Sequence, residues 1–438
     1  MTEYESLTKS GKLKSAVFGS FLIIPLKYDP NRAADIKTDE YFEAVGLTTA
    51  DIAEPVKDIF NPVKNINAGT FYKIKGSVNK LVLGIDDADA PIKVCDKSLL
   101  SVNVEEAPEV LFTSAYLAVF NTTVAFLALE IQYQKMEIPA LICNPGYAEL
   151  AARFMLRNGE EYIETDINAS IERFCKKLGF EKFFSESESL FLDAYTYNVA
   201  VTECRFKELE TIRQLTFNLH LMVSLDFPAE DESEDDVRYV YSVKAQGKGS
   251  YRWGCCVTSQ TISYVVADEN LNIKDELTTQ ANDGLPLVFI ALYEKYTCLR
   301  FTELLTQNNA VSHSKIKRMM FEFKAYGCVN PANISRWNNV RQIYSHIIET
   351  NGISEAISDI DSKIALIAEN QRERNESRTN ALAWILSVFG IVSIVASILS
   401  VVQVLQGGDA TVWIWAVLSS VIITVSIVVV LVIQKRRD

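Results

Sequence analysis

ALAWILSVFGIVSIVASILSVVQVL (Ala381–Leu405) and TVWIWAVLSSVIITVSIVVVLVI (Thr411–Ile433) are the two stretches that decide the architecture of this chain. Neither contains Asp, Glu, Lys or Arg, and each reaches the roughly 20 apolar residues that a helix needs to cross the hydrocarbon layer of a bilayer. Only residues 406–410 separate the two stretches, and so short a linker makes the helices antiparallel neighbours. We therefore expect a C-terminal two-helix transmembrane hairpin over residues 380–438, ending in a basic cytoplasmic tail.

Basic residues lie at the outer flank of each span, whereas the linker between the spans carries only Asp409. The flanking residues are Arg372, Arg374, Arg378, Lys435, Arg436 and Arg437. Lys and Arg close to membrane segments stay on the cytoplasmic side, so both termini are expected in the cytoplasm. Trp384, Trp413 and Trp415 lie near the ends of the spans, where amphipathic rings are enriched at the lipid interface.

The composition indicates a cytosolic N-terminal part without metal or disulfide chemistry. The segment MTEYESLTKSGKLKS at the N-terminus lacks the basic-then-apolar pattern of a signal peptide. The chain has 43 Lys and Arg against 56 Asp and Glu, a net charge of −13, which disfavours binding to nucleic acid. The eight cysteines form no CxxC pair and the three histidines show no ligand spacing, so we expect reduced core thiols and no transition-metal site.

The segment 1–332 is predicted to be one α+β (mixed α/β) domain. VFGSFLIIPL, residues Val17–Leu26, is a nearly continuous apolar run typical of a buried strand. Two runs rich in β-branched and aromatic residues, Val110–Phe120 and Thr123–Tyr133, predict a hairpin. Further helices are expected from Asn144 through AELAARFML and over Asp166–Leu178, Phe206–Val223, Leu285–Leu305 and Lys315–Tyr326, and strands over Val237–Val243 and Cys255–Ala267.

A helical stalk is predicted over residues 333–379. Isoleucines recur there at intervals of four and three, a heptad seam of about two heptads, and the helix enters the first span without a proline or glycine. The seam consists of Ile353, Ile357, Ile360, Ile364 and Ile367. So short a seam fits equally a coiled-coil stalk and an amphipathic helix packed on its own domain.

Small and polar residues recur every three or four positions along one side of the first span. They are Ser387, Gly390, Ser393, Ser397, Ser400 and Gln403. In an oligomer, hydroxyls and an amide on one face are able to line a water-filled pore. Small residues at this spacing also permit close helix packing, so pore lining and packing remain alternative interpretations.

A glycine-rich segment is the candidate ligand site. In QGKGSYRWG, residues 246–254, glycines allow backbone amides to approach a phosphate, Lys248 and Arg252 supply charge, and Tyr251 or Trp253 can stack on a base. A plain turn between two strands accounts for the same residues. The acidic run Glu230–Asp236 lacks the spacing and glycine of a calcium loop and is expected to be a solvated loop. No GxSxG, HExxH or Walker motif occurs, so no catalytic residues are predicted and an enzyme is not expected.

The overall layout resembles the CorA-like two-transmembrane superfamily. The shared features are an N-terminal α/β domain, a long helix leading into the first span, a short external linker, a second span and a basic tail. The Gly-Met-Asn tripeptide that marks the outer end of the first span in that superfamily is absent, because the corresponding residues Val401–Gly407 are VVQVLQG. The chain is therefore similar to divergent CorA-like membrane effectors found beside type III CRISPR systems.

That resemblance implies a homo-oligomer, a pentamer, in the bacterial inner membrane. Its cytosolic ring is expected to bind a nucleotide second messenger, a conjugate of S-adenosylmethionine and AMP, and to open or disrupt the bilayer in antiviral defence. The partners expected are the lipid bilayer, further copies of the chain and this small ligand, with no cofactor and no direct nucleic acid. The alternatives are a CorA-like divalent-cation (Mg²⁺) transporter and a membrane-anchored enzyme.

Overall fold

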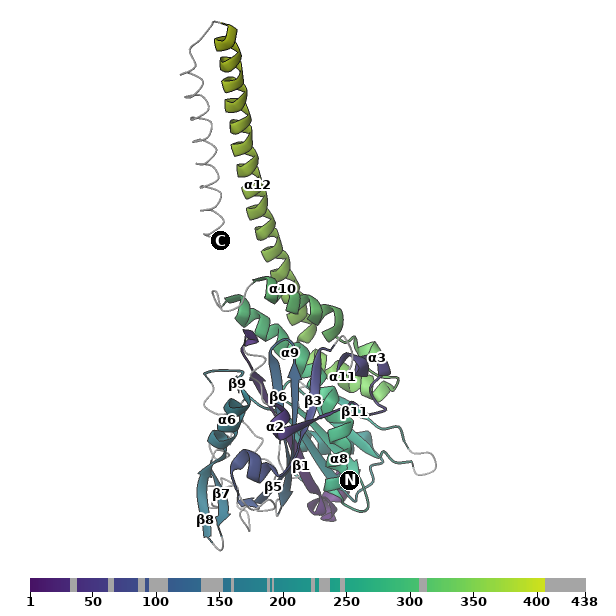
Figure 1. Ribbon diagram of the computed structural model, residues 1–438. Helices are drawn as coiled ribbons and strands as arrows, with labels where there is room; N and C mark the ends of the chain where they lie inside the picture. Colours follow the sequence, from purple (N-terminus) through teal and green to yellow (C-terminus); the bar gives the residue numbers. More distant parts are fainter. Residues whose placement is uncertain are drawn as a thin grey trace. The chain divides into compact units, whose positions relative to one another are not determined.

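The computed structural model of the chain describes residues 1–31, 38–61, 67–85, 91–93, 109–134, 153–158, 161–186, 190, 193–221, 225–227, 237–244, 249–306 and 313–405. The chain divides into two compact units, Met1–Ile360 and Asp361–Asp438. This division falls inside the segment 333–379 that the sequence assigns to the stalk. The first unit has the mixed α+β architecture predicted from the sequence (Figure 1).

The first unit is organised around one sheet of thirteen strands. Ten of them follow the order β11-β12-β13-β10-β1-β6-β5-β4-β7-β8, with β3 and β2 added beside β5 and β9 added beside β1. Within this sheet β10 and β13 are parallel, and the other pairs are antiparallel. The strands are β1 Val17–Lys27, β2 Phe42–Val45, β3 Gly69–Ile74, β4 Ile92–Lys93, β5 Glu109–Phe120, β6 Val124–Gln134, β7 Arg153–Asn158, β8 Glu161–Asp166, β9 Glu181–Lys182, β10 Tyr195–Thr202, β11 Arg238–Tyr241, β12 Trp253–Val257 and β13 Thr261–Ala267.

Helices cover both faces of the sheet. The α-helices of the first unit are α1 Glu3–Lys9, α2 Thr38–Tyr41, α3 Glu54–Ile59, α6 Ile167–Leu178, α7 Leu209–His220, α8 Ile273–Asn282, α9 Gly284–Thr306, α10 His313–Glu322 and α11 Asn338–Thr350. On one face, α6 and α7 contribute to a core cluster with side chains such as Phe18 and Leu22 of β1. On the other face α9 stacks Phe289 on Phe126 of β6, with ring centroids 6.1 Å apart, and α8 packs across β1 and β10.

A glycine permits α8 to lie directly on the central strand. A Cβ atom built on Gly19 of β1 would come within 2.6 Å of Cδ1 of Leu277 on α8, which is closer than real Cβ contacts. A side chain at position 19 would therefore require the Leu277 side chain to move. Helix α8, packed on these strands, forms one wall of the cavity described below.

The strand predictions for β1 and for the β5–β6 hairpin are confirmed. Val17–Lys27 is buried over nearly its whole length and pairs with β6 and β10. The hairpin has Ala118 opposite Phe126 and Val119 opposite Ala125, so its turn lies over Asn121–Thr123. The predicted helix Asp166–Leu178 is also confirmed, since Asp166 accepts a 2.9 Å hydrogen bond from the backbone N–H of Ala169 as the N-cap of α6.

Two predictions about local structure are wrong. The helix expected from Asn144 through Leu156 is contradicted at its C-terminal end, because Arg153–Asn158 is strand β7, paired with β4 and β8. Residues 144–152 lie outside the described part. Cys255–Ala267 was expected to be one strand, but it forms β12 and β13, joined by a turn in which Thr258 N–H donates 2.9 Å to Thr261 O. In both cases strand pairing overrides the local pattern, and a partner strand lies close by in the sequence.

A single helix, α12, runs from Ile353 to Leu405. This confirms the expectation of a helix that reaches the first span without interruption. Ile353 and Ile360 are buried within the first unit, which favours packing on the chain's own domain for this part of the isoleucine seam. The predicted second span, Thr411–Ile433, lies outside the described residues.

Candidate functional site

A cavity of about 280 Å³ opens on the face of the sheet that α8, α9 and α11 cover. Its sheet wall is formed by side chains of alternate residues on three neighbouring strands, which therefore point to the same face. They are Tyr197 of β10, Trp253 and Cys255 of β12, and Ile262, Tyr264 and Val266 of β13. Trp253 stacks on Tyr264 with ring centroids 5.1 Å apart and an interplanar angle of 30°. Trp253 and Tyr264 together form an aromatic platform on this wall.

The opposite wall is polar and comes from α8. Glu276, Thr279, Gln280 and Asp283 lie one helical turn apart and line the cavity. Gln280 Nε2 donates a 2.7 Å hydrogen bond to Glu276 Oε1, and the hydroxyl of Tyr197 donates to Gln280 Oε1. Because each bond fixes the orientation of the next group, the Gln280 amide presents a defined donor and acceptor arrangement.

The remaining walls come from α9, α11 and the loop before α3. Gly284, Leu287 and Val288 belong to α9, and Asn339, Val340 and Ile343 belong to α11. Asp51 contributes a carboxyl group from the loop before α3. This loop, three strands and three helices thus form one site.

Charge in the cavity is unevenly distributed. Three carboxyl groups, those of Asp51, Glu276 and Asp283, face one guanidinium group, that of Arg252. Burial raises the pKa of Glu276, against the hydrogen bond from Gln280 and the charge of Arg252. Burial and the charge of Asp283 also raise the pKa of Asp51, against the opposing charge of Arg336. For both carboxyl groups the effect of burial exceeds that of the nearby guanidinium, so a cationic group entering the cavity would lower both pKa values.

Of the four residues predicted to bind a ligand, the structure brings two into this cavity. Arg252 and Trp253 line it, with the backbone N–H of Arg252 donating 2.8 Å to Ser242 Oγ. Tyr251 is directed elsewhere: its N–H donates 2.7 Å to Phe206 O, and its ring contacts Tyr241 and lies 5.0 Å from Lys244 Nζ. Lys248 lies outside the described residues.

The sequence did not predict the acidic and amide side of the cavity. Glu276, Gln280 and Asp283 look like the solvent face of a helix, because their spacing of three and four residues is also that of an exposed stripe. Asp51 lies more than 200 residues away in a polar loop. The one available signal was the alternation of Trp253, Cys255, Tyr264 and Val266, which places large side chains on one face.

A second cavity, of about 360 Å³, lies beside α10 and the π-helix Phe323–Gly327. Its polar side chains include Asn67, Asn121, Thr122, Arg318 and Glu322. Arg318 and Glu322 form an exposed ion pair at 2.8 Å, and Asn67 Oδ1 already accepts from the N–H of Gly69. Tyr293, which also lines this cavity, stacks on Phe120 with ring centroids 4.2 Å apart, but it is only 1% exposed. We place the candidate ligand site in the first cavity, because that cavity contains Arg252 and Trp253, two of the residues predicted to bind a ligand.

Among the described residues, no group of three or more His, Cys, Asp or Glu side chains is placed to hold a metal ion. The described cysteines Cys175, Cys204, Cys255, Cys256 and Cys298 are buried, as expected for core thiols, and Cys328 is partly exposed. The acidic run Glu230–Asp236 lies outside the described residues.

In the described part of the chain, one helical segment is both long enough and apolar enough to cross a membrane: Glu376–Leu399 of α12. Trp384 and Leu386 are about 70% exposed (71% and 70%), and Gly390 has open space around it. The hydroxyls of Ser387 and Ser397 each donate 2.8 Å to a carbonyl one turn back, those of Ala383 and Ser393. On the basic flank, Arg372 forms a 2.8 Å ion pair with Glu376. Lys435, Arg436 and Arg437 lie outside the described residues.

Comparison with known proteins adds no relative: no family model, no curated protein and no solved structure matches this chain.

Proposed function

We propose that this chain is a signal-gated membrane effector or channel. In this proposal the first unit binds a nucleotide second messenger in the Arg252–Trp253 cavity, and α12 carries the response to the bilayer. The observation that carries the proposal is the continuity of α12. This helix begins with buried residues of the first unit, which contains the cavity, and continues without a break through the apolar segment Glu376–Leu399.

The cavity has the chemistry to hold one nucleotide moiety. Its volume of about 280 Å³ lies near the lower end of the range for small-molecule sites. Trp253, stacked on Tyr264, offers a platform for a base, and Arg252 offers a guanidinium for a phosphate. Carboxylates such as that of Glu276 accept hydrogen bonds from ribose hydroxyls.

The excess of carboxyl groups favours a ligand that also carries positive charge. A purely anionic nucleotide would meet three carboxyl groups and only one guanidinium. A conjugate of S-adenosylmethionine and AMP carries a sulfonium and an amino group beside its phosphate and its carboxylate, so one of its moieties can bring positive charge to the acidic wall. This ligand is the one that the CorA-like resemblance implies, and the cavity composition supports it independently.

The membrane half of the proposal follows from the sequence. In it, the chain is a multi-pass protein of the bacterial inner membrane that assembles as a homo-oligomer, a pentamer in the CorA-like arrangement. The stripe Ser387, Gly390, Ser393, Ser397, Ser400 and Gln403 then faces the pore or a neighbouring helix. Gating requires the ligand to bind one arrangement of the helices more tightly than the other.

The test uses the full-length chain in detergent and in sealed vesicles. The probes are the S-adenosylmethionine–AMP conjugate, S-adenosylmethionine and AMP, each titrated by calorimetry, with ion flux from the vesicles measured in parallel. We expect the conjugate to bind and to start flux, and Trp253→Ala to weaken binding by about tenfold or more through loss of stacking. Tyr239→Ala is the matched control, because this aromatic residue of β11 stacks on Tyr241 and does not line the cavity.

The alternatives give different results in the same assay. Magnesium flux without any probe would identify a cation transporter. Conversion of the probe into a product without flux would identify a membrane-anchored enzyme. Absence of binding by every probe, with flux unchanged, would overturn the proposal.

A further inference from the structure

Helix α11 forms a wall of the cavity and ends close to the start of α12. Asn339, Val340 and Ile343, in its N-terminal half, line the cavity. Its last residue is Thr350, and only Asn351 and Gly352 separate it from α12. Gly352 has φ = +58°, a conformation that a residue with a side chain rarely adopts, and its carbonyl accepts a 3.1 Å hydrogen bond from Ala356 N–H in the first turn of α12. Only this two-residue link therefore separates the helix that lines the cavity from α12.

The middle of α11 is held by a buried polar contact. The hydroxyl of Tyr344 donates 2.7 Å to Oε1 of Glu294 on α9, and the same oxygen accepts 2.8 Å from the backbone N–H of Val329. Tyr344 and Glu294 are both buried. Because neither group has water available as a replacement partner, this contact fixes the centre of the helix while its two ends make other interactions.

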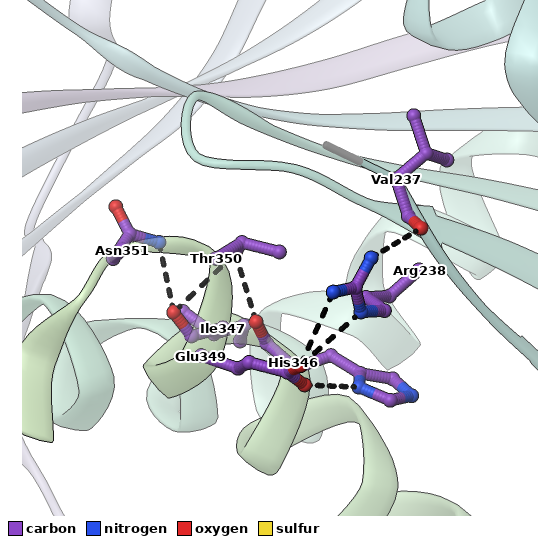
Figure 2. Close-up of polar contacts among 7 residues, drawn as sticks. All are labelled: Val237, Arg238, His346, Ile347, Glu349, Thr350 and Asn351. Atoms are coloured by element: carbon purple, nitrogen blue, oxygen red, sulfur yellow. Dashed lines mark hydrogen bonds and ion pairs between the residues drawn. The ribbon is translucent and has the colours of Figure 1, made fainter. Parts of the chain in front are cut away.

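The C-terminal end of α11 is tied to the strand beside the cavity wall. Nη2 and Nε of Arg238 on β11 lie 3.2 and 3.4 Å from Oε1 of Glu349, as Figure 2 shows. His346 Nδ1 lies 3.4 Å from the other Glu349 oxygen, and Nη1 of Arg238 donates 3.1 Å to Val237 O. Strand β11 pairs directly with β12, which carries Trp253. The Arg238–Glu349 ion pair thus links α11 to the strand next to β12.

A further contact reaches the link itself. Lys295 Nζ of α9 donates 2.7 Å to Asn351 Oδ1, and Asn351 Nδ2 donates 2.9 Å to Ile347 O. The link between α11 and α12 is therefore anchored to α9, which supplies the Leu287 and Val288 wall of the cavity.

We propose that α11 transmits occupancy of the cavity to α12, and that the Arg238–Glu349 ion pair sets how readily it does so. This inference rests on the proposed function, since it concerns regulation of the same site. Arg238 and Glu349 act as positioning residues, because neither lines the cavity. Their side chains are 30% and 53% exposed, so the ion pair is weak enough for ligand binding to outweigh it. An ion pair of this kind alters a two-state equilibrium by about two- to fivefold.

The experiment is a charge-swap cycle in full-length protein. Wild type, Arg238→Glu, Glu349→Arg and the double variant are reconstituted in vesicles, and the concentration of the S-adenosylmethionine–AMP conjugate that gives half-maximal ion flux is measured. We expect each single variant to shift this concentration by about two- to fivefold in the same direction, and the double variant to return it close to the wild-type value. Probe affinity in detergent should shift in the same direction, because the probe binds one arrangement of the helices more tightly than the other.

Two controls separate coupling from misfolding. Lys176→Glu breaks an ion pair with Glu172 at 2.9 Å on α6, which does not contact the cavity, and should leave the flux midpoint unchanged. Glu349→Gln keeps the side-chain shape and provides a milder variant should a charge reversal prevent folding.

The possible failures are distinguishable. Normal binding and flux in both single variants, or single shifts that simply add in the double variant, would overturn the role of α11 and leave the proposed function intact. Absence of probe binding by the wild-type chain would overturn the proposed function and this inference together.

Discussion

Nε of Arg300 donates a 3.0 Å hydrogen bond to Oγ1 of Thr123, the residue that turns the β5–β6 hairpin. Thr123 has φ = +69°, an unusual backbone conformation for a β-branched residue. The same guanidinium donates 3.1 Å to Tyr28 O through Nη2 and pairs at 2.5 Å with Glu303 through Nη1. Arg300 on α9 therefore holds the tip of the central hairpin and the end of β1 together from one buried position.

We expect Arg300→Met to destabilise the first unit by about 1–3 kcal/mol, because Thr123 and the Tyr28 carbonyl lose a buried donor while Glu303 keeps its ion pair with Lys27. The free energy of unfolding is measured by urea denaturation of the detergent-solubilised chain. Arg318→Met is the matched control: its side chain is 80% exposed and pairs with Glu322 on one helix surface. That variant should change the free energy by at most about 1 kcal/mol. Equal losses in both variants would contradict the structural role of Arg300.

The buried carboxyl group of Glu294 predicts a pH dependence of stability. Burial raises the pKa of Glu294 from 4.5 to about 7, against the hydrogen bonds from Val329 and Tyr344. Between these two pH values the folded chain holds a proton that the unfolded chain has released, so stability falls as pH rises from 4.5 to 7. The shift corresponds to about 3 kcal/mol.

Glu294→Gln removes this titration and keeps one oxygen as acceptor for Val329 and Tyr344. Wild type should therefore lose about 3 kcal/mol of unfolding free energy between pH 5 and pH 8 that the variant does not lose. Thermal melting at the two pH values measures the difference. Parallel pH profiles for wild type and variant would show that Glu294 does not titrate in this range.

His220 predicts a pH dependence of opposite sign. Burial lowers the pKa of His220 to about 4, and its Nδ1 lies 2.8 Å from Oγ1 of Thr261, the first residue of β13. Between pH 4 and 6.5 the unfolded chain binds a proton that the folded chain does not, so stability falls as pH decreases through this window. His220→Gln keeps a polar side chain near Thr261 but no longer titrates. On acidification through this window its unfolding free energy should therefore fall by about 3 kcal/mol less than that of wild type. Melting at pH 4.5 and 7 compares the two chains, and an unchanged difference between them would contradict this assignment.

The parts of the fold that the sequence predicted are those with a strong local pattern. Val17–Leu26 is apolar on both faces because β1 is covered by helices on both sides, and that burial is visible as an uninterrupted run. Asp166 and Gly179 mark both ends of α6 by ordinary capping. Such features depend on neighbouring residues alone.

The parts that the sequence did not predict depend on strand pairing and on contacts between distant residues. Arg153–Asn158 is a strand because it pairs with β8, which follows it closely, and with β4, about 60 residues earlier. Asn158-Gly159 is a dipeptide typical of hairpin turns, so only the pairing with β4 had no local signal. The glycine-rich segment identified Arg252 and Trp253 but not the opposite wall of Glu276 and Asp51. A ligand site built from a loop, three strands and three helices is defined by the topology of the sheet, which periodicity does not reveal.

The apolar part of α12 predicts a specific sensitivity to charge. Ile394 lies near the centre of the expected span Ala381–Leu405, where an arginine costs about 2.5–3.5 kcal/mol on insertion. Ile394→Arg should therefore reduce the fraction of chain retained in membranes after alkaline extraction. Leu366→Arg is the control, because Leu366 is 66% exposed on the same helix but precedes the span. Full extraction of the wild-type chain into the aqueous fraction would overturn the membrane assignment.

The expected topology predicts a difference between two aspartates replaced by the same residue. Asp409 lies in the linker between the expected spans and Asp438 is the last residue of the basic tail, so Asp409→Cys should face outward and Asp438→Cys the cytoplasm. A membrane-impermeant maleimide added to spheroplasts should label the first variant and leave the second unlabelled until the cells are opened. The native cysteines all precede Arg372, on the side expected to be cytoplasmic, so they should add no background in closed cells. Labelling of both variants in closed cells would mean that the chain crosses the membrane once, because an odd number of crossings places the C-terminus opposite the N-terminal unit.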